Sequence, residues 1–225
     1  MLTMSVARAA RVEEELKQDR REMVLDLEQR GIKDRRVLEV MLQIPRHLFV
    51  PRPLWHLAYG DHPLPIAEGQ TISQPYIVAL MVEALQVKLN HRVLEVGTGS
   101  GYQTLILASL AAEVYTVERL AKLSEEAERR LGELGRGNIH YRLGDGTRGW
   151  PEEAPYDRII ASGSVPQIPG SLIAQLADPG RLIIPVGDRH LQELVLLRRV
   201  QGELFQEELV PCSFLPLIGE EGWKE

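Results

Sequence analysis

A buried apolar strand that runs directly into alternating glycines is the segment of this sequence best suited to bind a small molecule. Glycine lacks a Cβ atom and tolerates positive φ, so its backbone amides can lie directly against a ligand. In an open α/β sheet, ligands bind at the carboxyl ends of the strands. Residues 93–102 read VLEVGTGSGY, and we expect a ligand to be lined by Gly97, Thr98, Gly99, Ser100 and Gly101.

Two ligand classes compete for such a turn. A dinucleotide-binding turn has the pattern G-x-G-x-x-G and places a pyrophosphate at the helix N-terminus. Here the sixth position is Tyr102, and Glu95 lies two residues before the first glycine. A carboxylate disfavours an anionic pyrophosphate and favours a cation. The pattern therefore favours S-adenosylmethionine, which carries a sulfonium and an ammonium group and no phosphate.

Acidic residues follow the next two predicted strands. Glu118 ends the second strand, where its carboxylate could accept from both ribose hydroxyls of the ligand. Asp145 and Gly146 follow the third strand, where a carboxylate could accept from an adenine amino group. Either acid alone could be an ordinary loop residue, but both follow successive strands behind a glycine turn, and this favours a cofactor site.

The elements that position these residues alternate between strand and helix. Such alternation predicts a doubly wound, mostly parallel α/β sheet, and two consecutive strands at the end predict antiparallel pairing at one edge. We expect strands at residues 92–96, 113–117, 139–143, 157–161, 181–185, 192–199 and 204–209, and helices at 102–110, 121–134 and 169–176.

The first part of the chain has a different texture. Residues 5–30 have apolar side chains at roughly helical spacing, which predicts one or two amphipathic helices, and Asp34 is a candidate N-cap for a further short helix. A proline-rich stretch over residues 45–75 breaks regular structure, and Pro75 suits the first turn of the next helix. We expect residues 1–90 to pack on a core formed by residues 91–225 within one structural domain.

Composition excludes several classes of protein. The chain has 225 residues, of which 44% are hydrophobic and 26% charged, as in an ordinary globular domain. Its net charge of −6 disfavours broad nucleic-acid binding, which requires a basic face. We expect no membrane span, no metal site and no signal peptide. Cys212 is the single cysteine, so no internal disulfide can form, and we expect a cytoplasmic protein. The oligomeric state cannot be read from the sequence.

Several ordered segments resemble the protein-L-isoaspartate O-methyltransferase family, from about Met23 to the end of the chain. These segments are PRHLFVP at 45–51, YGD at 59–61, PLPI at 63–66, GQTISQPYIVA at 69–79, the glycine turn at 93–103, GDG at 144–146, APYD at 154–157, GRL at 180–182, IPVG at 184–187 and FLPL at 214–217.

The resemblance implies a Rossmann-like methyltransferase with added N-terminal helices. The family transfers a methyl group from S-adenosylmethionine to the free α-carboxylate of L-isoaspartyl residues in damaged proteins and releases S-adenosylhomocysteine. The ester then closes to a succinimide, which hydrolyses partly to aspartate. The resemblance implies that Ser73 is the active-site residue and that Thr71 and Ile72 line the cofactor site. From its position alone, Ser73 could equally cap the helix that starts near Pro75.

Two other functions stay open at this point. A class I methyltransferase of the same fold could act on a small molecule or on RNA, and a cofactor-binding module could have no activity. The intact Ser73 segment and the negative charge favour the repair reaction. Residues 161–166, ASGSVP, depart from the threonine- and alanine-rich run that is usual in the family, at the place where we expect the substrate backbone.

Overall fold

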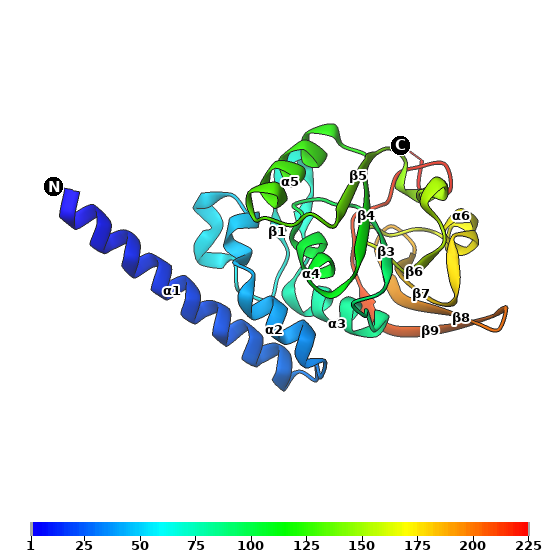
Figure 1. The fold of residues 1–225 in the computed structure, drawn as a ribbon, viewed down its shortest axis with the longest axis horizontal. Coiled ribbons are helices and arrows are strands. Elements are labelled where there is room, and N and C mark those ends of the chain that lie inside the picture. The colour runs from blue at the N-terminus through cyan, green and yellow to red at the C-terminus, as the bar shows by residue number, and fades with distance from the viewer. Residues whose placement is uncertain (1, 225) are drawn as a thin grey trace.

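The computed structural model describes the backbone of residues 2–224 and the side chains of residue 8 and residues 10–224. Its centre is a seven-stranded sheet in the order β5-β4-β3-β6-β7-β8-β9 (Figure 1). The strands are β3 (Arg92–Val96), β4 (Glu113–Glu118), β5 (Ile139–Leu143), β6 (Tyr156–Ala161), β7 (Leu176–Gly187), β8 (Gln192–Val200) and β9 (Glu203–Cys212). Strands β3 to β7 are parallel, and β8 and β9 are antiparallel at one edge. The predicted fold class is confirmed.

The strand order creates the place where a ligand can bind. From β3 the chain moves outward through β4 and β5, and it then returns to place β6 on the other side of β3. The order reverses between β3 and β6, and binding crevices of open α/β sheets lie at the carboxyl ends of such strands. The glycine turn leaves the carboxyl end of β3, so the topology brings it to this crevice.

Helices cover the sheet and bury its two faces in separate apolar clusters. Val93 belongs to the apolar cluster that includes residues of α1–α4, whereas the next residue, Leu94, belongs to a separate cluster that includes Leu172 of α6. This alternation is the side-chain period of a strand that is buried on both faces. The helices are α1 (Leu2–Gln29), α2 (Arg35–Gln43), α3 (Pro75–Leu85), α4 (Tyr102–Leu110), α5 (Ala121–Glu133) and α6 (Gly170–Ala174).

The N-terminal segment forms a single long helix rather than two. Helix α1 buries Leu16, Met23 and Leu27, and its N-terminal half extends away from the sheet (Figure 1). Asp34 caps α2 as predicted, with its side chain accepting a hydrogen bond from the backbone N–H of Arg36 at 3.0 Å. The α1–α3 side chains share one apolar cluster with the strands. The division at residue 90 stays a prediction.

The C-terminal strands are longer than predicted. We expected a helix to residue 176 and a strand at 181–185, but α6 ends at Ala174 and β7 runs from Leu176 to Gly187. Backbone pairing with both β6 and β8 extends β7 beyond its apolar centre. Gln201 and Gly202 connect β8 to β9, and both have positive φ, as a tight two-residue hairpin turn requires.

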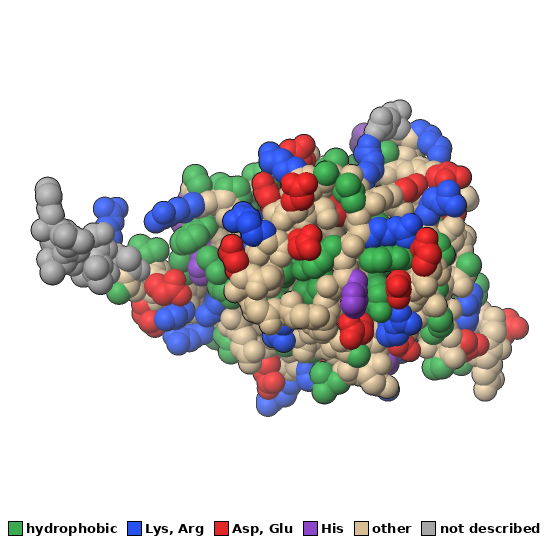
Figure 2. Space-filling view, turned by 45° about the horizontal axis from the view of Figure 1, so that its top comes forward, with side chains coloured by type: hydrophobic (Ala, Val, Ile, Leu, Met, Phe, Trp, Pro, Cys, Tyr) green, Lys and Arg blue, Asp and Glu red, His purple; other side chains and the backbone are tan. Residues whose placement is uncertain are grey.

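The surface shows no large region of one charge on the face in view. Basic and acidic side chains are interspersed there (Figure 2). Among residues 2–224, no helix is long and apolar enough to cross a bilayer. The same residues contain no group of three or more His, Cys, Asp or Glu side chains arranged to hold a metal ion.

Candidate active site

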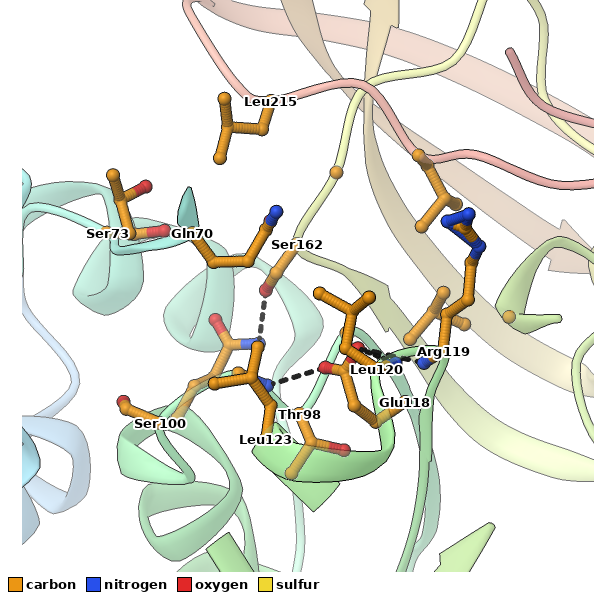
Figure 3. A pocket seen from close by; sticks show the side chains of 18 of the residues that line it. Gln70, Ser73, Thr98, Ser100, Glu118, Arg119, Leu120, Leu123, Ser162 and Leu215 are labelled. Atoms are coloured by element: carbon orange, nitrogen blue, oxygen red, sulfur yellow. Dashed lines mark hydrogen bonds between the residues drawn. The ribbon is translucent and has the colours of Figure 1, made fainter. Parts of the chain in front are cut away.

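A cavity opens at the carboxyl ends of β3, β4 and β6, where the sheet order reverses. Figure 3 shows Ser73 and Gln70 on one side of it, Glu118 and Leu120 on the other, and Ser162 between them. Most of the predicted cofactor residues line this cavity: Thr71, Ile72, Gly97, Thr98, Gly99, Ser100, Glu118 and Gly146. The active-site candidate Ser73 lines it as well.

The glycine turn has the backbone geometry that its sequence predicts. Gly97, Gly99 and Gly101 have φ of +91°, +54° and +85°, a region that disfavours residues with a Cβ atom. Gly97 and Gly99 line the cavity. Gly101 does not; a Cβ there would lie 3.0 Å from Leu131 Cδ1. Gly101 therefore allows α4 to pack closely on α5, and its contact with the ligand stays a prediction.

Gly146 is required by packing as well as by its place in the cavity. A Cβ at this position would lie 2.5 Å from Val96 Cγ1, at the end of β3. This distance is shorter than any van der Waals contact between carbon atoms, so a larger residue would push the segment away from the glycine turn.

Glu118 is held at the cavity wall by backbone amides. Its Oε2 accepts from the N–H of Gly99 at 2.9 Å, and its Oε1 accepts from the N–H groups of Arg119 and Leu120 at 2.8 and 3.0 Å. A carboxylate has about four acceptor positions, so at least one stays available to a ligand hydroxyl. The carboxylate is thus pre-oriented, and its contact with a ribose stays a prediction.

Glu95 has a different place from the one predicted. Its side chain is fully buried and does not line the cavity. Its Oε2 accepts from the Thr104 and Thr116 hydroxyls at 2.6 and 2.8 Å, and its Oε1 accepts from Gln103 Nε2 at 3.0 Å. Burial raises the pKa of Glu95 to about 7, against the hydrogen bonds, which lower it. Glu95 is connected to the cavity through Gln103 and through Thr116, whose hydroxyl shares a hydrogen bond with the lining residue Thr98. Its contact with the cofactor stays a prediction.

Gln103 connects Glu95 to the cavity. Its Nε2 donates both to Glu95 Oε1 and to Ser162 Oγ, the latter at 2.9 Å (Figure 3). These two acceptors fix the orientation of the amide, so that the amide oxygen is left free to accept from a ligand donor.

Asp145 is not among the residues that line the cavity, and its carboxylate accepts hydrogen bonds from protein groups on both oxygens. Its contact with an adenine amino group stays a prediction. Oδ1 accepts from the N–H and the hydroxyl of Thr147 at 2.8 and 2.7 Å, and Oδ2 accepts from the N–H of Glu220 at 2.7 Å. These bonds lower the pKa of Asp145, although burial opposes them. Asp145 therefore anchors the C-terminal segment, whose residues Leu215 to Ile218 line the cavity.

The segment that contains Ser73 forms a second wall. Thr71–Ile72 is strand β2, which pairs with β1 (Leu64–Pro65), and Ser73 follows it directly. Ser73 does not cap α3: the capping position belongs to Gln74, and no side-chain bond caps this helix. The structure thus removes the alternative explanation for Ser73 as a helix cap.

Ser73 lies where two cavities meet. The second cavity is bordered by the C-terminal end of β9 and the residues that follow it. The two cavities share Gln70, Thr71, Ser73, Ser162 and Leu215. Ser73 is therefore placed to contact molecules in both cavities.

Sequence reasoning missed several lining residues. Leu120 and Leu123 form an apolar wall after Glu118. Two leucines at the start of an otherwise charged helix could have indicated a buried or ligand-facing surface there. Ser162 lies in the ASGSVP run, where only a substrate contact was expected. The C-terminal residues 215–218 overlap the FLPL segment, but their own residue types do not place them at the cavity, because they reach it by pairing with Ser164 far away in sequence.

Comparison with known proteins gives one consistent family. The family model described as protein-L-isoaspartate(D-aspartate) O-methyltransferase matches residues 18–222. A protein-L-isoaspartate O-methyltransferase of Dictyoglomus thermophilum is 52% identical over 211 residues, which cover 94% of this chain and 96% of that protein. One of Methanoculleus marisnigri is 51% identical over 209 residues, covering 92% and 95%.

Solved structures agree. A protein-L-isoaspartate O-methyltransferase structure superposes with a TM-score of 0.80 at 29% identity, covering 90% of this chain and 67% of that one. A Plasmodium falciparum structure, described as a putative member of the same enzyme class in complex with S-adenosyl-L-homocysteine, has a TM-score of 0.76 at 26% identity and covers 88% of this chain and 98% of that chain. With these matches over nearly its whole length, the chain belongs to the protein-L-isoaspartate(D-aspartate) O-methyltransferase family.

Proposed function

We propose that this protein transfers a methyl group from S-adenosylmethionine to the free α-carboxylate of L-isoaspartyl residues in damaged proteins. The observation that carries the proposal is the position of Ser73 at the junction of two cavities, one of which has the glycine turn and the oriented Glu118 of a cofactor site. Family membership and the activities of the relatives support the same reaction.

The residues present fit an adenosyl cofactor. The left-handed glycines at 97 and 99 leave space without side chains, and Leu120 and Leu123 offer an apolar surface for a flat base. Glu118 offers an acceptor for ribose hydroxyls, and the oriented amide oxygen of Gln103 offers one for an ammonium group. When bound, S-adenosylmethionine supplies an electrophilic methyl group on a positively charged sulfur.

The acceptor site needs orientation more than proton transfer. A carboxylate is already ionised near neutral pH, with a reference pKa of about 4, so no general base is required. We propose that the Ser73 hydroxyl donates to one carboxylate oxygen and thereby aims the other at the cofactor. Placing two reactants in the correct geometry can supply several kcal/mol of rate enhancement.

We propose that the cavity along residues 211–215 holds the peptide that carries the isoaspartyl residue. Its border contains the polar backbone that follows β9, together with Pro63, Gln74 and Ile77 on the other side. The net charge of −6 disfavours RNA as the acceptor. A protein-repair reaction and a chain with one cysteine both fit the reducing cytoplasm, where we place the protein.

The test is methyl transfer from labelled S-adenosylmethionine to two synthetic peptides that differ only in isoaspartate or aspartate at one position. We expect transfer to the isoaspartyl peptide alone and a base-labile ester that decays through a succinimide. Equal transfer to both peptides, or none to either while cofactor binding is intact, would overturn the proposed substrate.

A further inference from the structure

A fully buried arginine lies behind the active-site segment. The Arg46 side chain has no exposed surface, and no carboxylate of the described residues forms an ion pair with it. Burial lowers the pKa of Arg46, but a guanidinium stays protonated in proteins. A buried cation without a paired anion is costly. Favourable contacts of the guanidinium with the rest of the protein must offset this cost.

The guanidinium of Arg46 joins three segments that are distant in sequence. Its Nε donates to the carbonyl oxygen of Ala58 at 2.8 Å, and its Nη2 donates to the carbonyl oxygen of Ser73 at 2.9 Å. Its Cζ lies 4.9 Å from the ring centroid of Tyr102, the first residue of α4, directly after the glycine turn. Arg46 therefore contacts Ala58, the Ser73 backbone on the acceptor side of the site and Tyr102 on the cofactor side together.

We propose that Arg46 is a positioning residue for methyl transfer, which fixes the backbone of Ser73 relative to the helix that follows the glycine turn. The proposal rests on the proposed function. Ser73 comes directly after the two-residue strand β2 and before α3, so no long element of its own holds it. Its carbonyl is instead bound by a rigid planar group that simultaneously lies against Tyr102, a residue of the cofactor cavity.

The geometry requires an arginine rather than any cation. The planar fork presents donors in two fixed directions and stacks on an aromatic face, and lysine provides a single flexible point charge. Lysine at position 46 has no planar group, so it cannot present donors in these two fixed directions and also stack on the Tyr102 ring. The conservative Arg46→Lys variant keeps the charge and removes the positioning.

A second buried arginine provides a matched control. Arg158 is 8% exposed, and it too donates to two backbone carbonyls, those of Asp157 at 2.6 Å and Gln86 at 3.4 Å. It lies near the amino end of β6, whereas the cavity lies at the carboxyl end, and Arg158 lines neither cavity. Arg158→Lys therefore disturbs a buried arginine without touching the site.

The experiment compares wild type, Arg46→Lys, Arg158→Lys, Ser73→Ala and the double variant Arg46→Lys/Ser73→Ala. For each protein we would measure the melting temperature, the affinity and stoichiometry of S-adenosylhomocysteine binding by calorimetry, and kcat and KM on an isoaspartyl peptide. Dividing kcat by the binding stoichiometry removes any unfolded fraction from the comparison.

We expect Arg46→Lys to lower kcat per binding site roughly 10- to 100-fold, the range expected for misplacing a reacting group by about 1 Å. Cofactor affinity should change less than about threefold, and Arg158→Lys should keep kcat within about twofold of wild type. Because Arg46 acts through Ser73, adding Arg46→Lys to the Ser73→Ala variant should lower kcat per binding site by less than about threefold.

A kcat per site in Arg46→Lys equal to that of wild type would overturn the proposal. A double variant whose loss of kcat equals the product of the two single losses would overturn it as well. A loss of kcat in Arg158→Lys equal to that in Arg46→Lys would also overturn it, because the effect would then follow from changing any buried arginine. Absence of transfer by the wild-type protein would overturn the proposed function, and the role of Arg46 with it.

Discussion

The buried Glu95 carboxylate predicts a specific dependence of stability on pH. Its pKa is raised from the ordinary 4.5 to about 7, because burial outweighs its three hydrogen bonds. A group with a raised pKa in the folded protein binds its proton more tightly there than in the unfolded chain. Its stabilising contribution is therefore fully present below pH ~4.5 and is lost as the pH rises through ~7.

The magnitude follows from the size of the shift. A difference of about 2.5 pKa units corresponds to roughly 3 kcal/mol of unfolding free energy, at about 1.4 kcal/mol per unit. The side chain is fully buried, so solvent screening does not reduce this value. Glu95→Gln removes the titration. The variant should gain roughly 3 kcal/mol relative to wild type between about pH 4.5 and pH 8.

The assay is urea unfolding followed by circular dichroism at several pH values over this range. Glu203→Gln, an exposed glutamate on the edge strand β9, is the control and should follow wild type within about 0.5 kcal/mol. A difference in unfolding free energy between wild type and Glu95→Gln that is the same at every pH would contradict this prediction.

Four further predictions follow from the site. As the pH rises through ~7, the affinity of wild type for S-adenosylmethionine should increase relative to its affinity for S-adenosylhomocysteine, because the positive sulfonium favours ionised Glu95. A ratio of the two affinities that does not change with pH in calorimetry, or the same trend in Glu95→Gln, would contradict this. Ser73→Ala should lower kcat roughly 10- to 150-fold through the loss of about 1.5–3 kcal/mol of a hydrogen bond to a carboxylate, with cofactor affinity nearly unchanged; equal losses in both would give Ser73 a purely structural role. Gly99→Val should abolish cofactor binding in calorimetry, because φ of +54° excludes a β-branched residue and the side chain would fill the cavity; unchanged affinity would show that the ligand lies elsewhere. Asp145→Ala should lower the unfolding free energy by about 1–3 kcal/mol and speed hydrogen exchange at the amides of Glu220 and its neighbours; unchanged exchange would show that Asp145 does not anchor them.

The parts of the fold that could be predicted were those with a local signal. The short strand at residues 92–96 is apolar and ends at the glycine turn, so it was predicted with its correct bounds, as was the helix at 102–110. The strand β7 was predicted too short, because its extension depends on pairing with neighbours on both sides rather than on its own residues.

The sequence indicates which residues lie at the carboxyl end of the sheet. It does not indicate which of their side chains point into the cavity. Glu95 and Glu118 are both acidic residues at strand ends, yet one is fully buried behind Gln103 and the other lines the cavity. The alternation of side chains along a strand and the packing of the next helix decide between these outcomes. The Arg46 contact with Ser73 spans 27 residues, and nothing in the spacing of the sequence indicates it.

The most direct test of the two-cavity account is a crystal structure with S-adenosylhomocysteine and an isoaspartyl peptide bound together. The account predicts the cofactor product against Gly97, Gly99 and Glu118, the peptide along residues 211–215, and the isoaspartyl α-carboxylate within hydrogen-bonding distance of Ser73 Oγ. A carboxylate bound away from Ser73, or a peptide outside the second cavity, would contradict it.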